Sequence, residues 1–260
     1  MGISGHKRIV VKVGTSSLTY GSGGLNLKKI DKLSWVLTDL RNRGLEVVLV
    51  SSGAIAVGSE RLGLQKRPRD ILGKQAASAV GQAILMQIYS GFFMSYNQKV
   101  AQILLTRDVM ENEKLKSNAR NTINTLFSMG IIPIVNENDT VSTDELGFSE
   151  NDALSAYVAC LVDSDMLIML SDSDGFYDSD PKKNPGARLI PVVESITDIM
   201  ENSAEGPSTD LGTGGMITKI NAAKMASASG IDTVVISGED PSTIFSVLEG
   251  EQVGTIFLRK

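Results

Sequence analysis

Four short apolar segments constrain the fold most, because each has the length of a β-strand and runs directly into small or polar residues. They end near Val13, Val50, Val135 and Leu170, and helix-like segments separate them. Strands that alternate with helices predict an α/β fold with a mostly parallel sheet covered by helices. The carboxyl ends of parallel strands share one edge of the sheet, so we expect the four polar motifs to converge there.

The same pattern extends over the whole chain. Strands are expected over residues 7–13, 45–50, 99–105, 130–135, 165–170, 231–237 and 254–258. Helices are expected over residues 27–43, 70–97 (as one or two helices), 117–129, 153–161, 216–229 and 241–248, with a short extension and helix over 190–201.

The composition limits the class of protein. The 260 residues, 42% of them hydrophobic, suffice for one large α/β domain or two lobes. A net charge of -5 without a long basic run argues against a nucleic-acid partner. No apolar stretch reaches roughly 18 residues and no signal peptide opens the chain, so we expect a cytoplasmic protein without a membrane span.

Cysteine and histidine are too scarce for several kinds of site. Cys160 is the only cysteine and His6 is the only histidine. The chain therefore lacks a disulfide framework and a cysteine metal cluster, and zinc sites or a histidine general base are not expected. A P-loop is also missing, because Gly73-Lys74 is followed by Gln75 where Ser or Thr is required.

The segment from Asn136 to Ala153 is the strongest candidate for chemistry. It contains the pairs Asn138-Asp139 and Asn151-Asp152, a strand-like run precedes it, and a helix-like run follows it. A polar loop between a strand and a helix is typical of a ligand site at the carboxyl end of a sheet. The alternative is a capped loop, because Asn and Asp are common in turns and at helix N-termini.

Two earlier motifs admit a ligand or a structural explanation. Lys12 lies inside the first strand, just before the loop Gly14-Thr-Ser-Ser17. It is either a snorkelling lysine on an edge strand or a lysine that holds a phosphate beside backbone donors. The small residues of Ser51–Gly58 either bring a ligand to a helix N-terminus or allow close packing of strand and helix.

Two later motifs complete the set. The run Ser171-Asp-Ser-Asp-Gly175 resembles the start of a calcium loop, but Lys183 stands where the bidentate glutamate is required, which argues against calcium. Three glycines at 212, 214 and 215 precede a helix and form a candidate anion cradle, with a flexible loop as the alternative. Lys219 in the first turn of that helix opposes the helix dipole unless an anion lies nearby.

Together these motifs bring two lysines, glycine-rich donors and carboxylate or amide groups to one edge. Such a set suits phosphoryl transfer, which depends mostly on positioning and charge neutralisation. An acceptor that is already ionised at pH 7, such as a carboxylate with a pKa of ~4.3, needs no general base. The scarcity of histidine agrees with that kind of acceptor.

These motifs resemble those of the amino acid kinase family, in the expected order and over essentially the whole chain. The resemblance rests on residues 12–16, 51–56, 136–139, 151–152, 171–172 with Gly175 and Asp180-Pro181, and 212–219. The glycine-rich motif is shared widely in the family, whereas the motifs at 51–56 and 136–139 are specific to its glutamate-phosphorylating branch. The resemblance implies an αβα sandwich around a mostly parallel open sheet, with a glutamate-binding lobe (1–164) and a nucleotide-binding lobe (165–260).

The resemblance also implies an activity: ATP-dependent phosphorylation of the side-chain carboxylate of L-glutamate to L-glutamyl 5-phosphate, the first step of proline biosynthesis. Lys12 and Lys219 would neutralise the transferring phosphoryl group, and Asp152 would orient both lysines. Glutamate binding is expected of Ser52, Gly53, Ala54, Asn136, Asp139 and Asn151. ATP binding is expected of Lys12, Ser171, Asp172, Thr213, Gly214, Gly215, Met216 and Lys219. Mg²⁺ would be held mainly by the phosphates of ATP, so no side chain is assigned to a metal.

Several expectations reach beyond the site. Many bacterial members carry a C-terminal PUA domain, for which no residues remain after Lys260, so a short form is expected. Ser171 stands where the family usually has threonine, and the hydroxyl is retained. Proline as a feedback inhibitor, a homo-oligomer and coupling to a glutamyl-phosphate reductase are also expected.

Two alternatives remain open at this point. One is a sibling kinase that acts on another small acid or phosphate acceptor, such as acetylglutamate or a nucleoside monophosphate. The other is a nucleotide-binding regulatory module without turnover. Asp139 argues against acetylglutamate, which has no ammonium group to pair with it, and the presence of both lysines with Asp152 argues against the module.

Overall fold

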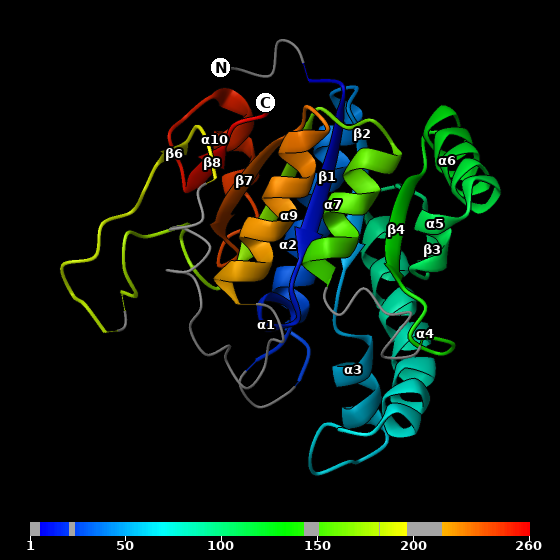
Figure 1. The fold of residues 1–260 in the computed structure, drawn as a ribbon. Coiled ribbons are helices and arrows are strands. Elements are labelled where there is room, and N and C mark those ends of the chain that lie inside the picture. Colours follow the sequence, from blue (N-terminus) through cyan, green and yellow to red (C-terminus); the bar gives the residue numbers. More distant parts are fainter. Residues whose placement is uncertain (1–5, 21–23, 143–150, 182, 197–214) are drawn as a thin grey trace.

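The computed structural model describes residues 6–20, 24–142, 151–181, 183–196 and 215–260. Strands and helices alternate along this part of the chain (Figure 1), as the apolar pattern predicts. The strands are β1 Arg8–Val13, β2 Glu46–Ser51, β3 Val100–Leu105, β4 Ile132–Glu137, β5 Met166–Ser171, β6 Val192–Val193, β7 Asp232–Ser237 and β8 Thr255–Phe257. The helices are α1 Thr15–Leu18, α2 Leu27–Asn42, α3 Ala54–Arg61, α4 Ile71–Ser95, α5 Asp108–Glu111, α6 Glu113–Ser128, α7 Asn151–Leu161, α9 Met216–Ala228 and α10 Thr243–Glu249.

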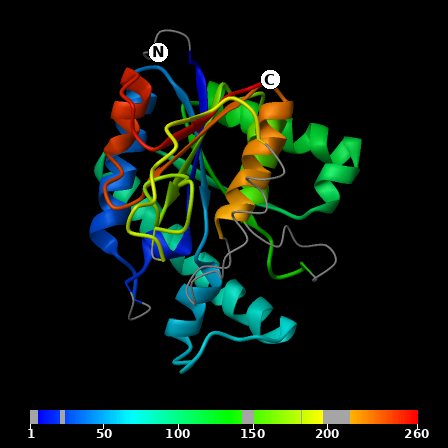
Figure 2. The same cartoon turned by 60° about the vertical axis from the view of Figure 1, so that its left-hand side comes forward.

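The described strands form one 8-stranded sheet in the order β3-β4-β2-β1-β5-β7-β8-β6. Neighbouring strands are parallel except β7 and β8, which pair antiparallel. Helices cover both faces of the sheet, with α7 and α9 on one face and α2 and α10 on the other (Figures 1 and 2). The prediction of an α/β sandwich around a mostly parallel sheet is therefore confirmed.

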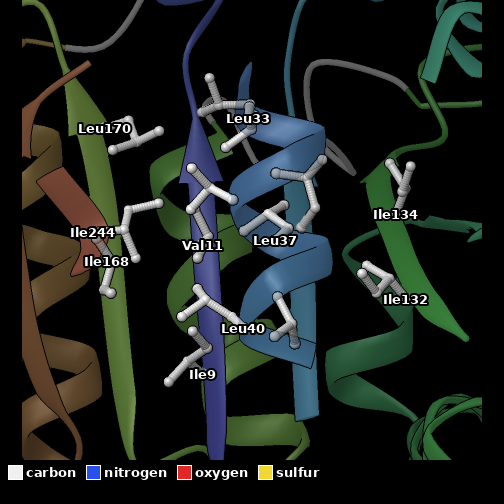
Figure 3. Close-up of a cluster of buried hydrophobic side chains, with 14 of the residues drawn as sticks. Ile9, Val11, Leu33, Leu37, Leu40, Ile132, Ile134, Ile168, Leu170 and Ile244 are labelled. Atoms are coloured by element: carbon white, nitrogen blue, oxygen red, sulfur yellow. The ribbon is translucent and has the colours of Figure 1, made fainter. Parts of the chain in front are cut away.

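Two hydrophobic cores lie on the two faces of this sheet. In β1, Val10 packs into the core that contains α7 and α9, whereas Ile9 and Val11 pack into the core that contains α2 and α10. This alternation follows from strand geometry, in which successive side chains point to opposite faces. Figure 3 shows the second core, where β1 faces the leucines of α2: Leu33, Leu37 and Leu40. Burial on both faces explains why the central strands read as unbroken apolar runs.

The sheet divides at the contact between β1 and β5. Strands β1 to β4 form one half, strands β5 to β8 form the other, and β1 pairs with β5 from Ile9–Met166 to Val13–Leu170. The two halves correspond in residue numbers to the two expected lobes, 1–164 and 165–260. The ligand assigned to each lobe stays a prediction.

Several predicted helices have different limits in the structure. Helix α6 begins at Glu113 instead of 117, because the side chain of Asn112 accepts hydrogen bonds from the backbone N–H groups of Lys114 and Leu115. Helix α7 begins at Asn151, two residues before the predicted start. The segment expected over 190–201 contains β6, and its residues 197–201 lie outside the described part of the chain.

Helix α4 is one continuous helix, and Gly81 of α4 and Gly58 of α3 mark a close contact between the two helices. A Cβ atom on Gly81 would lie 1.8 Å from the carbonyl oxygen of Ala54, and one on Gly58 would lie 1.7 Å from that of Ala77. Both residues must be glycine for the two backbones to approach this closely. This contact holds α4 beside the loop that follows β2. In the described part of the chain, no helix combines the length and apolar character needed to cross a membrane.

Candidate active site

Three buried charged side chains meet at the carboxyl ends of the central strands. Lys12 Nζ of β1 lies 2.6 Å from Asp152 Oδ1, and Lys219 Nζ of α9 lies 3.5 Å from Asp152 Oδ2. Asp152, in the first turn of α7, is 1% exposed, and the two lysines are 7% and 5% exposed. The hydroxyl of Thr218 also donates to Asp152 Oδ2 at 2.7 Å. Two lysines thus share one carboxylate in a site largely shielded from water.

The electrostatics of Asp152 follow from these contacts. Burial alone raises the pKa of Asp152, but the charges of Lys12 and Lys219 and the hydrogen bonds from Lys12 and Thr218 lower it to about 2. Asp152 is therefore ionised at neutral pH. It is also the anion that Lys219 requires in the first turn of a helix, where a cation alone opposes the dipole.

The snorkelling explanation for Lys12 is wrong. Strand β1 lies in the interior of the sheet between β2 and β5, and the Lys12 side chain is buried instead of reaching water. A buried lysine requires a counter-charge, which Asp152 supplies. The other explanation, a lysine that holds a phosphate beside backbone donors, stays a prediction.

A chain of amide groups lies on the β4 side of the lysines. Asn151 Nδ2 donates to the carbonyl oxygen of Ser51 at 2.8 Å, to Ser52 Oγ at 2.9 Å and to Asn136 Oδ1 at 2.9 Å. Asn136 Nδ2 donates in turn to Gln82 Oε1 of α4 at 2.8 Å. The structure thus joins Ser52, Asn136 and Asn151, which come from three distant segments of the sequence.

Asp139 lies next to this chain of amide groups, in the loop after β4. Its Oδ2 accepts a hydrogen bond from Ser78 Oγ of α4 at 2.9 Å. Burial raises the pKa of Asp139 to about 6; the hydrogen bond from Ser78 lowers it, Glu137 raises it, and Arg67 and Lys74 lower it. Asp139 is therefore a partly buried carboxylate that is protonated more readily than an exposed one, and a cationic ligand would stabilise its ionised form.

The loop after β2 presents backbone groups to the same edge. Gly53 has φ of 105° and directly precedes the first residue of α3, Ala54. Only glycine adopts this conformation without strain, which explains the Ser-Ser-Gly-Ala sequence. The N-terminus of α3 therefore lies beside Ser52. The contacts of Gly53 and Ala54 with a ligand stay predictions.

Some of the predicted nucleotide residues lie at the end of β5 and at the start of α9. Ser171 is buried at the end of β5, where its Oγ donates to Asp172 Oδ1 at 3.2 Å. The Ser171 carbonyl oxygen accepts from the N–H of Gly238, and a Cβ atom on Gly238 would lie 2.5 Å from Ser17 Oγ. The loops after β1, β5 and β7 therefore touch.

Gly215 and Met216 lie at the start of α9. Gly215 is the N-cap residue of α9 and has no side chain to satisfy the first N–H groups of that helix, so they are candidates for binding an anion. Thr213 and Gly214 lie outside the described residues. Their predicted contacts with ATP stay predictions.

Four residues in contact with the predicted site received no role in the sequence analysis: Ser78, Gln82, Glu137 and Thr218. Ser78 and Gln82 lie one helical turn apart on α4, together with Gln75, whose Nε2 donates to the carbonyl oxygen of Ser142. Polar residues at i, i+3 and i+7 in an otherwise apolar helix were the available signal. The sequence analysis assigned no site residue to this helix, which is incomplete.

The comparison with protein families identifies the family of this chain. The model of the amino acid kinase family matches residues 7–237, so the chain belongs to the amino acid kinase family. The carbamate kinase of Giardia lamblia, solved bound to AMP-PNP, shares the fold with a TM-score of 0.69, although it is 16% identical over 99% of this chain and 100% of its own.

Two bacterial relatives define the similarity more closely. The chain is 55% identical to the glutamate 5-kinase of Clostridium perfringens, over 98% of this chain and 96% of the relative. It is 52% identical to the glutamate 5-kinase of Listeria welshimeri, over 98% of this chain and 94% of the relative. Each of these two matches therefore includes both halves of the sheet. The described site residues lie within the matched part of the chain.

Proposed function

We propose that this chain phosphorylates the side-chain carboxylate of L-glutamate with ATP and forms L-glutamyl 5-phosphate, the activity for which the glutamate 5-kinases are named. In this reaction the carboxylate oxygen forms a bond to the γ-phosphorus atom, the bond between that atom and the β,γ-bridging oxygen breaks, and ADP leaves. The acceptor is already ionised at neutral pH, so no proton has to be removed from it.

The cluster of Lys12, Asp152 and Lys219 carries this proposal. A phosphoryl group in transfer spreads negative charge over its oxygens, and fixed cations in a site with little water stabilise that charge. Asp152 holds both ammonium groups in place before any ligand arrives. Preorganised charges need little rearrangement when the reaction occurs, which is why such clusters suit phosphoryl transfer.

The amide chain and Asp139 support an amino acid as the acceptor. The hydrogen-bonded groups of Ser52, Asn136 and Asn151 offer neutral polar contacts, whereas Asp139 gains stability from a cation nearby. An α-ammonium group supplies that cation. N-acetylglutamate does not, and its binding would leave the Asp139 charge partly desolvated without a partner.

ATP would occupy the other side of the lysines. The edge formed by Ser171, Asp172 and the N-terminus of α9, together with Lys12 and Lys219, fits a polyphosphate, because helix N-terminal amides and lysines both attract phosphate oxygens. Mg²⁺ would arrive with ATP and stay bound mainly to its phosphates. Residues 1–164 would thus hold the amino acid and residues 165–260 the nucleotide.

An ATP-dependent assay over a panel of acceptors tests the proposal, with hydroxylamine trapping the acyl phosphate as a hydroxamate. The panel contains L-glutamate, L-aspartate, N-acetyl-L-glutamate and UMP, and ADP release is measured in parallel. We expect hydroxamate from L-glutamate in the presence of Mg²⁺ and little product from N-acetylglutamate. Equal turnover of glutamate and N-acetylglutamate, or preference for UMP, would contradict the assignment and favour a sibling kinase.

Regulation and cellular setting extend the same proposal. Proline resembles a cyclised glutamate, so we expect it to inhibit by overlapping the glutamate site near Asn136 and Asn151. Adding proline to the same assay tests this, because inhibition that saturating glutamate leaves untouched would contradict overlap. A homo-oligomer, a cytoplasmic location and coupling to a glutamyl-phosphate reductase, which consumes the unstable acyl phosphate, belong to this proposal as well.

A further inference from the structure

The orientation of the amide chain is fixed by backbone groups at both ends. The backbone N–H of Glu137 donates to Asn136 Oδ1 at 2.9 Å, and an N–H can only donate. The Ser51 carbonyl oxygen accepts from Asn151 Nδ2, and a carbonyl can only accept. Reversing either asparagine amide would therefore place two donors or two acceptors face to face.

These constraints determine what Gln82 must provide. Asn136 Oδ1 already accepts from Glu137 and from Asn151, so Asn136 Nδ2 must face Gln82. Gln82 meets it with its carbonyl oxygen, Oε1, at 2.8 Å. The Asn136 and Gln82 side chains are 3% and 7% exposed, so little water is available to replace that acceptor.

We propose that Gln82 positions the acceptor substrate through Asn136 and Asn151, without itself taking part in the chemistry. The Oε1 atom of Gln82 holds the Asn136 amide, whose Oδ1 holds Asn151 against Ser52. In the part of the chain that the structure describes, no group donates to Asn151 Oδ1. We expect Asn151 to contact a donor on the substrate, for which the α-ammonium of the proposed amino acid is suitable.

The position of α4 explains why this contact is rigid. The glycine contact between α3 and α4 fixes the helix beside the loop after β2. One turn before Gln82, Ser78 donates to Asp139, and two turns after it Tyr89 shares a hydrogen bond of 2.9 Å with Ser51 Oγ. The same face of α4 therefore contacts the ends of β2 and β4 at three levels.

This inference rests on the proposed function for the identity of the substrate, and variants of Gln82 test it separately. Gln82→Met keeps the size of the side chain and removes the acceptor. Gln82→Glu keeps an acceptor oxygen in either protonation state. In Gln82→Asn the side chain is shorter by one methylene group, so its carbonyl oxygen lies further from Asn136 Nδ2. This variant provides a second test if Gln82→Met folds poorly.

We expect Gln82→Met and Gln82→Asn to raise the KM for glutamate by about tenfold, equivalent to ~1.4 kcal/mol. The kcat and the KM for ATP should change by less than about threefold, because the lysines and the nucleotide edge are untouched. Gln82→Glu, assayed at pH 8 so that Asp139 is ionised, should stay within about threefold of the unmodified protein.

Thr38→Val is the matched control, since it removes one buried hydrogen bond, from Thr38 Oγ1 to the carbonyl oxygen of Ser34 within α2, and leaves every group of the amide chain in place. It should lower the melting temperature and leave the KM for glutamate unchanged. If Gln82→Met keeps the original KM, or if Gln82→Glu is impaired as strongly as Gln82→Met, the positioning role is wrong. If the unmodified protein prefers another acceptor in the panel, the proposed function fails, and the same comparison is made with that acceptor.

Discussion

Replacing Asp152 by asparagine tests the charge cluster most directly. The change keeps the shape of the side chain and removes the only charge that it carries. Asp152 now offers one oxygen to Lys12 and the other to Lys219 and Thr218. Asparagine has only one oxygen, so its amide N–H₂ group must face either an ammonium group or the Thr218 hydroxyl beside Lys219.

The magnitude follows from the burial and pKa of Asp152. A pKa of about 2, compared with the ordinary 3.8, corresponds to ~2.5 kcal/mol of preference for the ionised form at ~1.36 kcal/mol per pKa unit. Removing one partner from a buried ion pair typically costs ~3–5 kcal/mol. A loss of about 3 kcal/mol corresponds to a fall in melting temperature of roughly 6–12 °C for a domain of this size.

Catalysis should be affected more strongly than stability. Without Asp152 the two lysines repel each other and lose their fixed positions, so we expect kcat to fall by about 10²–10³. The assays are thermal melts and steady-state kinetics with trapped acyl phosphate. A variant that melts within about 1 °C of the original and keeps kcat within threefold would refute the reasoning.

Asp240→Asn is a suitable control because Asp240 has a similar pKa in a different environment. Burial raises the pKa of Asp240, but hydrogen bonds from Lys32 and Ser242 lower it to about 2. Asp240 and Lys32 form an ion pair of 2.8 Å with side chains 50% and 41% exposed. Solvent screens such a pair, so its loss should cost only ~0–1 kcal/mol and leave kcat unchanged.

The pH dependence of stability distinguishes the charge effect from a packing effect. Because the folded-state pKa of Asp152 is lowered, its stabilisation is fully present above pH ~4 and is lost as the pH falls towards 2. The difference in unfolding free energy between the original protein and Asp152→Asn should therefore narrow over that range. A difference that stays constant between pH 4 and 2 would indicate lost packing instead.

Two further predictions concern the lysines and Asp139. Lys12→Ala and Lys219→Ala should each lower kcat more than they raise the KM for glutamate in steady-state kinetics. Lys12→Arg should also lower kcat, because a planar guanidinium does not replace a point charge. A near-normal kcat of Lys219→Ala would contradict the role of Lys219. For Asp139, burial raises the pKa to about 6, and binding of an ammonium group requires the ionised form. The KM for glutamate should therefore rise roughly tenfold as the pH falls from 7 to 5. Asp139→Asn should raise the KM and make it nearly independent of pH over this range. If the KM of the variant still depends on pH as in the original protein, the titrating group is not Asp139.

The sequence predicted the parallel sheet because its strands are buried on both faces and therefore appear as apolar runs. β1 illustrates this, since Ile9, Val10 and Val11 pack alternately into two cores. The convergence of Lys12 with Asp152 was also predictable. Lys12 lies near the carboxyl end of β1, and Asp152 lies in the first turn of the helix that follows β4. The start of α6 was missed because Asn112 was not recognised as its N-cap.

The contribution of α4 could not be predicted from the local sequence in the same way. Ser78 and Gln82 reach the site only because Gly58 and Gly81 allow α3 and α4 to pack with their backbones in contact. That contact depends on residues more than 20 positions apart, and a helix rich in Ala and Met reads as core whether or not one face meets a ligand. Tertiary packing, not local propensity, makes these two residues part of the site.

The distribution of charge over the candidate site explains how it can work without histidine. The lysines that would face the phosphoryl group are cationic, whereas the groups joined to the acceptor side through Ser52, Asn136, Asn151 and Gln82 are neutral. A cation held against the acceptor carboxylate would stabilise its charge before reaction and so weaken it as a nucleophile. Neutral amides would orient the substrate without that penalty, and Asp139 would recognise it through the ammonium group instead. The cations then act chiefly where negative charge develops during transfer, which is the distribution that favours the transition state over the bound substrates.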